Sequence, residues 1–331
     1  MVRCGIIGFG KMGKIRAHAL EKSGRAQVVA VYDIVDIEDC PYPVMDSPES
    51  VIDADLDAVF VCTPNYQITP LVKESLKKGR HVFAEKPPGV SLEEAEAMRT
   101  CETEHSPYKL MFGFNHRHHG SIMKMKEIID SGEMGKLLWM RGRYGKEVNN
   151  DFFKGWRTKK ELAGGGILLD QGIHMLDLFR YFAKDFDEVK AFVSNLYWKL
   201  EGLEDNAFVI LRNSETGVSA SLHSTMTQWR YIFSLEVFLE EGALVLNGLK
   251  TSSGAYGDED LAIKKNSKGT HDGNFDSEQR INYRIDHSWD SEINHFLDCI
   301  ENDDRPALGN SDDAVEIMKL IDKIYKDSQY H

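Results

Sequence analysis

Asp170 and His174 have the residue types and the spacing for proton-transfer chemistry. They lie four residues apart in the run GGGILLDQGIHMLD, residues 164–177, where the apolar spacing predicts a helix. Residues four apart share a helix face, so the carboxylate and the imidazole would point the same way. An imidazole with an ordinary pKa of about 6.5 can take the proton of a hydroxyl group, and a nearby carboxylate can bind a neighbouring hydroxyl. Asp177 lies about one turn beyond His174 on much the same side.

Lys86 is a third candidate, because it stands where a predicted strand ends. It follows the apolar run His81–Ala84 within Glu85-Lys86-Pro87, and Thr63-Pro64-Asn65 follows another apolar run, Ala58–Cys62. Ligands of open parallel sheets bind at the carboxyl ends of the strands. We therefore expect both motifs to lie in a ligand site.

A glycine-rich turn follows the first predicted strand. Its sequence is Gly8-Phe9-Gly10-Lys11-Met12-Gly13, and the next predicted strand ends at Asp33. Glycines let backbone amides approach a pyrophosphate at a helix N-terminus, and an acid about 20 residues on can bind the hydroxyls of an adenosine ribose. The pattern predicts a dinucleotide site with these contacts: Gly8, Gly10, Lys11, Met12, Gly13, Asp33, Thr63, Pro64, Asn65, Glu85 and Lys86.

Asp33 also predicts which dinucleotide binds. An acid at this place repels a 2′-phosphate unless a basic residue follows to bind it. Residues 34–72 contain no Lys or Arg, and Asp36, Glu38 and Asp39 follow Asp33 closely. We therefore expect NAD rather than NADP.

The first third of the chain alternates apolar runs with segments of helical spacing, which is typical of a parallel sheet with crossover helices. The helix starts are marked by a cap and a first-turn proline at Ser47-Pro48-Glu49 and by a capping-box pattern at Ser91-Leu92-Glu93-Glu94. The expected strands are Val2–Ile7, Gln27–Tyr32, Ala58–Cys62, His81–Ala84 and Leu110–Phe112, and the expected helices include Met12–Ser23 and Ile68–Lys78.

After Gly120 the apolar pattern changes to a period of two, which predicts about five strands in an antiparallel sheet. Asn213–Gly217 has the composition of a hairpin turn, and Asn266–Asp286 is polar with no clear period. The expected elements are helices near Ile122–Ser131 and Ile167–Phe182, a strand near Leu137–Tyr144, further strands to Lys265, and helices over Glu292–Ile300 and Ala314–Tyr325.

In their order and spacing these motifs resemble those of the glucose-fructose oxidoreductase and inositol dehydrogenase family, often called Gfo/Idh/MocA. The resemblance covers nearly the whole chain and also includes Gly113-Phe114-Asn115 followed by Arg117, and Trp156-Arg157. It implies an α/β protein with an amino-terminal Rossmann domain, residues 1–120. It also implies a carboxy-terminal α/β domain, residues 121–331, whose open, mainly antiparallel sheet serves substrate binding and oligomerisation. The implied reaction is NAD(P)-dependent redox chemistry on sugars, cyclitols or sugar derivatives.

In that reaction Lys86, Asp170 and His174 are the expected catalytic residues. His174 would accept the hydroxyl proton, Lys86 would donate to the developing alkoxide, and Asp170 would orient the site. The family often has a non-trans bond before the proline that here is Pro87, and Ile68 stands where many members carry a histidine. The expected substrate contacts are Lys86, Asn115, Arg117, Tyr144, Trp156, Arg157, Asp170 and His174.

The segment 141–160 contrasts with the rest of the chain, because it holds seven basic residues against two acids. An anionic substrate would explain the contrast, with Arg157 as the best two-point contact, and a solvated strand and loop would explain it equally well. The neighbouring run His116-Arg117-His118-His119 resembles a metal-binding cluster. No cysteine or carboxylate set accompanies it, so we expect no metal.

Composition excludes several classes of protein. The 331 residues include 40 Lys and Arg against 53 Asp and Glu, and the net charge of −13 disfavours binding to nucleic acid or anionic membranes. The uncharged stretch Ala58–Val72 contains two prolines and is too short to span a bilayer. The five cysteines have no paired or metal-type spacing and the chain starts without a signal-peptide pattern, so we expect a cytoplasmic protein.

Three functions remain open at this point. The leading interpretation is an NAD-dependent dehydrogenase of a sugar, sugar nucleotide or cyclitol in carbohydrate or surface-polysaccharide synthesis, assembled as a homodimer or homotetramer through an uncovered sheet face. The alternative is an NAD-dependent glycosidase of the same fold, which oxidises the sugar transiently, eliminates the glycosidic group and then reduces the product. An NAD-sensing protein without catalysis is disfavoured, because Lys86, Asp170 and His174 are all present.

Overall fold

The computed structural model describes residues 1–251, 254–266 and 275–330. Within them the chain divides into two compact units. The first consists of Met1–Asn115, Glu161–Gly164 and Ser288–Lys319, and the second of His116–Lys160, Gly165–His287 and Leu320–His331. The expected second domain, residues 121–331, included Ser288–Lys319, whereas the structure groups that segment with the first unit.

The first unit contains the expected parallel sheet. Its five strands lie in the order β2-β1-β3-β4-β5, and every neighbouring pair is parallel. The Rossmann-like architecture is therefore confirmed, because each apolar run of the sequence forms a buried strand. The strands are β1 (Val2–Ile7), β2 (Ala26–Tyr32), β3 (Ala58–Val61), β4 (His81–Glu85) and β5 (Leu110–Gly113).

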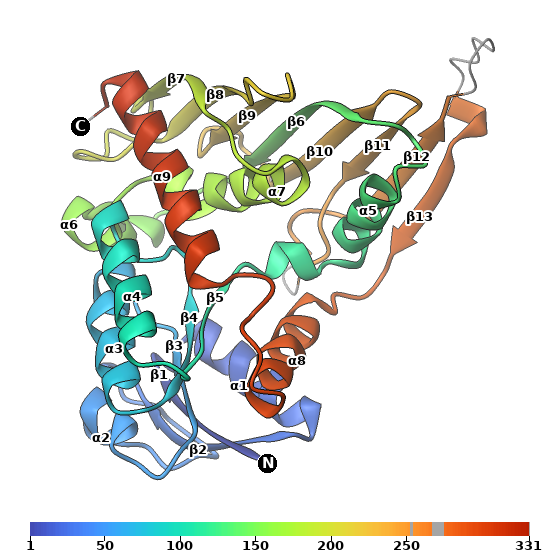
Figure 1. Ribbon diagram of the computed structural model, residues 1–331. Helices are drawn as coiled ribbons and strands as arrows, with labels where there is room; N and C mark the ends of the chain where they lie inside the picture. The colour runs from blue at the N-terminus through green and yellow to red at the C-terminus, as the bar shows by residue number, and fades with distance from the viewer. Residues whose placement is uncertain (252–253, 267–274, 331) are drawn as a thin grey trace. The chain divides into compact units, whose positions relative to one another are not determined.

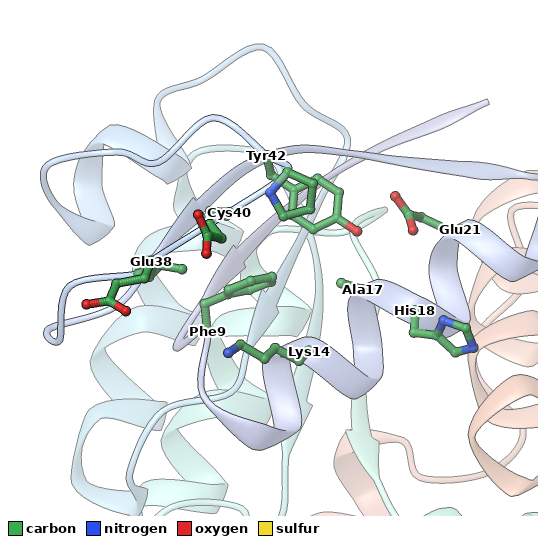
Figure 2. A pocket seen from close by; sticks show the side chains of 11 residues that line it. Phe9, Lys14, Ala17, His18, Glu21, Glu38, Cys40 and Tyr42 are labelled. Atoms are coloured by element: carbon green, nitrogen blue, oxygen red, sulfur yellow. The ribbon is translucent and has the colours of Figure 1, made fainter.

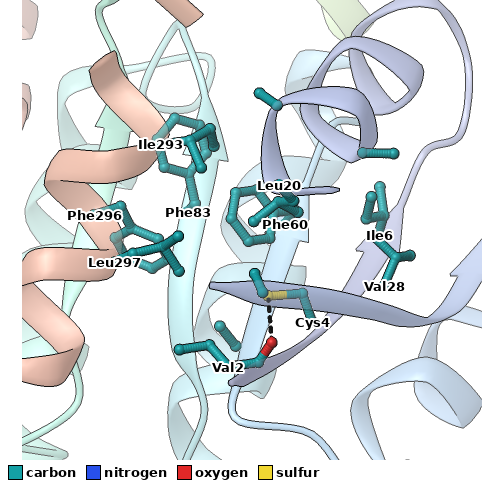
Figure 3. Packing of buried hydrophobic residues seen from close by; sticks show 14 of the residues in the cluster. Val2, Cys4, Ile6, Leu20, Val28, Phe60, Phe83, Ile293, Phe296 and Leu297 are labelled. Atoms are coloured by element: carbon teal, nitrogen blue, oxygen red, sulfur yellow. Dashed lines mark hydrogen bonds between the residues drawn. The ribbon is translucent and has the colours of Figure 1, made fainter. Parts of the chain in front are cut away.

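One face of this sheet packs against α1 (Lys11–Ser23) and α8 (Ser288–Glu301) (Figure 3). Phe60 and Phe83 stack with their ring centroids 5.2 Å apart, and Phe296 of α8 meets each ring edge-on at 5.6 Å. Burying three aromatic rings stabilises the unit by several kcal/mol, on the order of 2 kcal/mol for each side chain. This contact explains why Ser288–Lys319 belongs to the first unit.

The opposite face is covered by α3 (Asn65–Lys77) and α4 (Leu92–Glu104), with α2 (Pro48–Ile52) beside β1 and β2 (Figure 1). The cap of α2 is confirmed, because Ser47 Oγ accepts the Ser50 amide. The capping box of α4 is only half formed. Ser91 Oγ accepts the Glu94 amide, but the Glu94 carboxylate accepts the Val90 amide rather than that of Ser91.

The second unit is built on a sheet of eight strands in the order β13-β12-β11-β10-β6-β9-β8-β7. All pairs are antiparallel except β6 and β9. The expectation of about five strands was therefore too low. The strands are β6 (Leu137–Gly145), β7 (Glu188–Ser194), β8 (Asn206–Arg212), β9 (Ser219–Thr225), β10 (Ile232–Leu239), β11 (Gly242–Asn247), β12 (Glu259–Lys265) and β13 (Gln279–Tyr283).

The missed strand β13 falls in the segment Asn266–Asp286, which the sequence predicts to be irregular. This edge strand has no buried residue, so the apolar alternation that marks a strand is absent from it. Residues 267–274 of the same segment lie outside the described part of the chain. The hairpin turn at Asn213–Gly217 is confirmed, since it joins the antiparallel strands β8 and β9.

Helices α5 (Gly120–Ser131) and α7 (Ile173–Ala183) lie on one face of the eight-stranded sheet (Figure 1). At Gly142 of β6 an added Cβ would come within 2.5 Å of Met175, so α7 approaches the sheet closely. The expected helix over 167–182 is wrong in its first turn, because Leu168–Gly172 forms a π-helix, η4, before α7 begins. The remaining helical elements are η1 (Asn115–His118), η2 (Phe152–Lys154), η3 (Trp156–Thr158), α6 (Lys160–Ala163), η5 (Phe275–Ser277) and α9 (Ser311–Ser328).

The other face of this sheet carries exposed apolar and aromatic side chains. Phe192 of β7 is 81% exposed and Ile210 of β8 is 61% exposed. Phe208, directly opposite Phe192, stacks on His223 of β9 with the centroids 3.9 Å apart. These side chains form an apolar row that is exposed to solvent in a single copy of the chain.

Candidate active site

The glycine turn between β1 and α1 has room for glycine alone at two positions. Gly8 has a φ of +90°, and an added Cβ would lie 2.6 Å from the carbonyl oxygen of Cys62. At Gly13 a Cβ would lie 2.2 Å from the carbonyl oxygen of Gly8. Gly10, by contrast, has open space where its Cβ would be, and it caps α1 without a side-chain hydrogen bond. The first amides of α1 are therefore presented as anion donors.

Two polar groups adjoin this turn. Thr63 follows β3, and its Oγ is buried without a hydrogen-bond partner among the described residues. Asn65 starts α3, and its Nδ2 donates to the carbonyl oxygen of Ala163 at 2.8 Å. A buried hydroxyl without a protein partner beside the turn fits a bound polar ligand, since such groups rarely stay unpaired. The residues present thus fit a dinucleotide in the expected place.

Asp33 stands at the end of β2, and its carboxylate accepts the Val35 amide at 3.0 Å. Ile34 is 86% exposed and Val35 is 69% exposed. Adjacent to the carboxylate, these apolar side chains give a flat nucleobase a surface to cover. The arrangement agrees with an adenosine site at this strand end.

A hollow of about 240 Å³ lies between α1 and residues 37–42 (Figure 2). Its floor is apolar, with Phe9 from the glycine turn and Ala17 from α1. Glu21, Glu38 and Asp39 also line it, against Lys14 and His18. Burial raises the pKa of Tyr42 to about 12, and the hydrogen bond with Glu21 adds to this rise. An excess of carboxylates makes this hollow a poor place for a phosphate.

Lys86 follows β4 directly, and the peptide bond to Pro87 is cis. The preceding Glu85 is buried and lies 2.7 Å from the guanidinium of Arg16, which also lies 2.6 Å from Glu292 of α8. Burial alone would lower the pKa of Arg16, but the two carboxylates raise it above its ordinary value. Arg16 thereby fixes the backbone that carries Lys86 to helices α1 and α8.

Asp170 lies in the π-helix η4, whose N-terminal side is held by a buried carboxylate. Glu204 accepts the amides of Gly166 and Leu168, each at 2.9 Å, and the hydroxyl of Tyr325 at 2.9 Å. At Gly166 an added Cβ would lie 2.0 Å from the carbonyl oxygen of Glu204. The glycine run before Asp170 therefore allows this segment to pack against Glu204.

Two basic side chains flank the carboxylate of Asp170. Lys146 Nζ lies 2.5 Å from one oxygen, and Arg157 Nε lies 3.5 Å from the other. Arg157 also lies over the ring of Trp156, 4.3 Å from its centroid. Elsewhere in the basic segment, Arg141 pairs with Glu236 and Lys154 with Asp151. Much of its positive charge is therefore met by carboxylates of the same unit.

His174 lies in the first turn of α7 and is buried. Its ring stacks on that of His116, with the centroids 3.9 Å apart and the planes inclined by 19°. Tyr144 of β6 lies 6.2 Å from the ring of His174, and burial raises its pKa well above the ordinary value. The phenol and the two imidazoles form one buried cluster on the sheet.

Two further predicted contacts have strong protein partners. Arg117 forms a two-point ion pair with Asp177, with Nε 2.8 Å and Nη2 2.6 Å from the two carboxylate oxygens. Both groups are buried. In the first unit, Asn115 Nδ2 lies 3.2 Å from Ser288 Oγ at the start of α8.

Within the second unit, the contacts above join Trp156 and Arg157 to Asp170, and Tyr144 to His174. The first unit carries Lys86 and the glycine turn. The sequence does not point to Glu204 or to Tyr256, whose ring lies 5.2 Å from that of Tyr144. His116 and Lys146 have a local signal only as members of the histidine run and of the basic segment 141–160. Among the described residues no group of three or more metal-ligating side chains occurs. None of the helices they form is long and apolar enough to cross a membrane.

Comparisons with known proteins match both units. Residues 2–114 match the family described as oxidoreductase family, NAD-binding Rossmann fold, and residues 122–245 match the GFO/IDH/MocA C-terminal domain. The chain is 26% identical over 327 residues to the uncharacterized oxidoreductase YrbE of Bacillus subtilis, covering 92% of this chain and 89% of that protein. It is also 26% identical to the myo-inositol 2-dehydrogenase of Thermotoga maritima, covering 96% of this chain and 93% of that protein.

Solved structures share the fold at low identity. Levoglucosan dehydrogenase in complex with NADH and levoglucosan aligns over 99% of this chain and 97% of its own, with a TM-score of 0.86 and 20% identity. KijD10, a 3-ketoreductase from Actinomadura kijaniata in complex with NADP and TDP-benzene, aligns over 98% and 97%, with a TM-score of 0.83 and 21% identity.

Proposed function

Since the chain belongs to the Gfo/Idh/MocA family of NAD-binding oxidoreductases, we propose that it oxidises a secondary hydroxyl of a sugar, sugar nucleotide or cyclitol with NAD. The family makes the protein an NAD(P)-dependent enzyme of the sugar and cyclitol dehydrogenase type. The observation that carries the finer proposal is the set of proton-transfer groups: Lys86 at a strand end of the cofactor sheet, and Asp170 and His174 in the second unit.

NAD, when bound, supplies the hydride acceptor. The imidazole of His174 takes the hydroxyl proton as the hydride leaves, because histidine is the side chain whose ordinary pKa lies closest to neutral pH. The ammonium of Lys86 donates a hydrogen bond to the oxygen on which negative charge develops. Asp170, held by Lys146 and Arg157, accepts a hydrogen bond from a neighbouring hydroxyl and fixes the sugar ring.

The cofactor preference rests on the end of β2. The carboxylate of Asp33 would accept hydrogen bonds from both ribose hydroxyls, and no cation follows it before Lys73. The acidic lining of the hollow in Figure 2 adds repulsion against a 2′-phosphate. NAD is therefore the proposed cofactor, used in the cytoplasm for carbohydrate or surface-polysaccharide synthesis.

A fluorescence screen for NADH formation tests this function. The protein with NAD is mixed with free sugars, inositols, sugar phosphates and nucleotide sugars, and at least one class should give net NADH. A glycosidase returns its hydride in each turnover, so product release without net NADH would assign the protein to that class instead. NAD binding without turnover of any substrate would leave only a binding function.

Two variants then test the assigned roles. His174→Ala and Lys86→Ala should lower turnover by about two to four orders of magnitude while NAD still binds. Lys78→Ala, at an exposed position of the first unit, is the control and should change turnover less than about twofold. A folded, NAD-saturated His174→Ala that keeps turnover within about threefold of the parent would remove histidine from the proton step.

We also infer a homo-oligomer. The outer face of the eight-stranded sheet exposes Phe192, Phe208 and Ile210 in neighbouring strands. A row of this kind on an open sheet is stabilised when a second copy covers it. A twofold contact would place each row against the same row of its partner.

A further inference from the structure

His116 faces the proposed base directly, although the reaction as described gives it no part. It comes from η1, whereas His174 comes from α7, and each ring is about 5% exposed. With the centroids 3.9 Å apart and the planes inclined by 19°, the two imidazoles lie face to face. In this geometry the rings do not hydrogen-bond to each other, so their influence on each other is through charge and packing.

A chain of hydrogen bonds fixes the other edge of His116. Its Nε2 lies 3.1 Å from the hydroxyl of Tyr144, and Tyr144 hydrogen-bonds to Tyr256. The amide of Gln171, in η4, donates to the hydroxyl oxygen of Tyr256 at 2.5 Å. The chain therefore runs from η1 across β6 to η4, the helix that carries Asp170.

Burial is the main influence on both phenols of this chain. It raises the pKa of Tyr144 and that of Tyr256 above ordinary values, so both hydroxyl groups keep their protons near neutral pH. The Tyr144 hydroxyl can therefore donate to Nε2 of His116 or accept from it, and either bond fixes the plane of the His116 ring.

The stack tolerates one positive charge but not two. Two imidazolium rings less than 4 Å apart repel each other strongly in a buried site. An imidazolium over the face of a neutral ring is attracted to it instead. The ring of His119 meets that of His116 edge-on, with the centroids 5.7 Å apart, and His119 Nδ1 lies 2.9 Å from the buried Glu259 carboxylate. Phe233 of β10 closes another side at 5.9 Å.

We propose that His116 is a positioning residue for His174: its neutral ring, held by Tyr144, fixes the plane of the accepting imidazole and stabilises the imidazolium that proton transfer creates. This inference rests on the proposed role of His174 as the base. The stacking partner raises the proton affinity of His174 only while it stays flat and uncharged. A ring without charge at position 116 should therefore do better than a flexible polar side chain.

Two substitutions separate the ring from its hydrogen bond. His116→Phe keeps a flat, neutral ring and loses the hydrogen bond with Tyr144, whereas His116→Gln keeps a polar group that can bond Tyr144 and loses the ring. We expect kcat to fall about tenfold or more in His116→Gln and less than about threefold in His116→Phe, with KM and the Kd for NADH within about threefold in both. If the role of His116 were purely structural, kcat and Tm would fall together in both variants, and kcat would not fall further in His116→Gln than in His116→Phe.

Titration of His174 by NMR, with histidine labelled by ¹³C and ¹⁵N, provides a readout without substrate. In the NAD-loaded protein the midpoint for His174 should fall by about 0.5 pH unit or more in His116→Gln and stay unchanged in His116→Phe. An equal midpoint in the parent and both variants would overturn the inference. Failure of every substrate to react would instead overturn the proposed function, and the titration would still test the stack.

Discussion

The guanidinium of Arg16 lies 2.7 Å from the carboxylate of Glu85, and both residues are buried. Arg16 belongs to α1, the helix that begins at the glycine turn, and Glu85 is the residue before Lys86. The Arg16 side chain also packs over Phe83 and Trp289, with 4.4 Å and 4.8 Å from the guanidinium carbon to the ring centroids. One buried cation thus joins the cofactor-binding helix to the strand end that carries the proposed electrostatic catalyst.

Replacement of this cation should destabilise the protein severely. Arg16→Met leaves the carboxylates of Glu85 and Glu292 buried without their cation, which costs about 3–5 kcal/mol of unfolding free energy. Urea unfolding measures the loss. The matched control is Lys22→Met, which breaks an exposed ion pair between the same two helices and should cost less than about 1 kcal/mol. Equal losses of unfolding free energy in the two variants would show that the buried ion pairs of Arg16 stabilise the protein no more than the exposed pair of Lys22.

The cofactor preference should reverse when the charge at the end of β2 is changed. Asp33→Ser combined with Ile34→Arg removes the repulsion and adds a cation, so NADP should gain and NAD should lose about tenfold or more in Kd. Fluorescence titration with NADH and NADPH measures both. Asp46→Ser, at an exposed acid outside the group that follows Asp33, is the control and should leave the preference unchanged. Equal affinity of the parent for NAD and NADP would contradict the role of Asp33.

Asp170→Asn should affect both binding and turnover. The substitution removes a charged acceptor for a sugar hydroxyl that is already engaged in the ground state, so KM should rise while kcat falls. It also breaks the contacts with Lys146 and Arg157. Steady-state kinetics with saturating NAD separate the two effects.

Asp151→Asn, which breaks the exposed pair with Lys154, is the control and should change neither KM nor kcat by more than about twofold. An unchanged KM in Asp170→Asn would exclude Asp170 from substrate binding.

Glu204 gives the stability a defined dependence on pH. Burial raises the pKa of its carboxyl above the ordinary value of 4.5, against the hydrogen bonds from Gly166, Leu168 and Tyr325, which lower it. The pKa of Glu204 is higher in the folded state than in the unfolded state. Its contribution to the free energy of unfolding is therefore fully present below pH 4.5, the ordinary pKa, and is lost as the pH rises through the raised pKa of the folded state. A glutamine does not titrate, so the stability of Glu204→Gln lacks this dependence on pH.

The stability gap between the parent and Glu204→Gln should therefore be wider at pH 5 than at pH 8, as urea unfolding at the two pH values would show. The exposed neighbour Glu201, replaced by Gln, should give the same small difference at both. If the difference in unfolding free energy between the parent and Glu204→Gln increased toward pH 8, the surroundings of Glu204 would stabilise its ionised carboxylate, contrary to this prediction.

A charge on the outer sheet face should break the proposed oligomer. Phe208→Glu places a carboxylate opposite Phe192 and beside Ile210, where a second copy would have to bury it. Light scattering at micromolar concentration should give a dimeric or tetrameric mass for the parent and a monomeric mass for the variant. Glu215→Gln, in the exposed turn between β8 and β9, is the control. A monomeric parent would contradict the assignment.

Local pattern predicted the cofactor half of the molecule closely. The apolar runs of β1 to β5 and the Gly8–Gly13 turn are legible because each strand is buried on both sides and each turn needs glycine. The π-helix over Leu168–Gly172 could not be predicted from the local sequence. It depends on Glu204, a residue from another part of the chain that accepts the amides of Gly166 and Leu168.

The candidate site was predicted only as far as its types and spacings allowed. Asp170 and His174 are four residues apart in the sequence, so that a shared helix face could be predicted from the spacing alone. His116 and Tyr256 enter through contacts across the sheet and from a loop, which no local pattern encodes. The same applies to α8. Its apolar spacing predicts a helix, but not that this helix packs against the parallel sheet of the first unit.

The position of Phe296 against Phe60 and Phe83 also has a consequence for synthesis on the ribosome (Figure 3). All five strands of the cofactor sheet leave the exit tunnel before residue 120, yet one face of that sheet stays uncovered at Phe60 and Phe83 until α8 has been translated. During the intervening elongation, the nascent chain presents an apolar surface of the kind that chaperones bind. The packing therefore leads us to expect that the dinucleotide unit is completed only near the end of translation, because a chain interrupted before Ser288 lacks the helix that covers this face of the sheet.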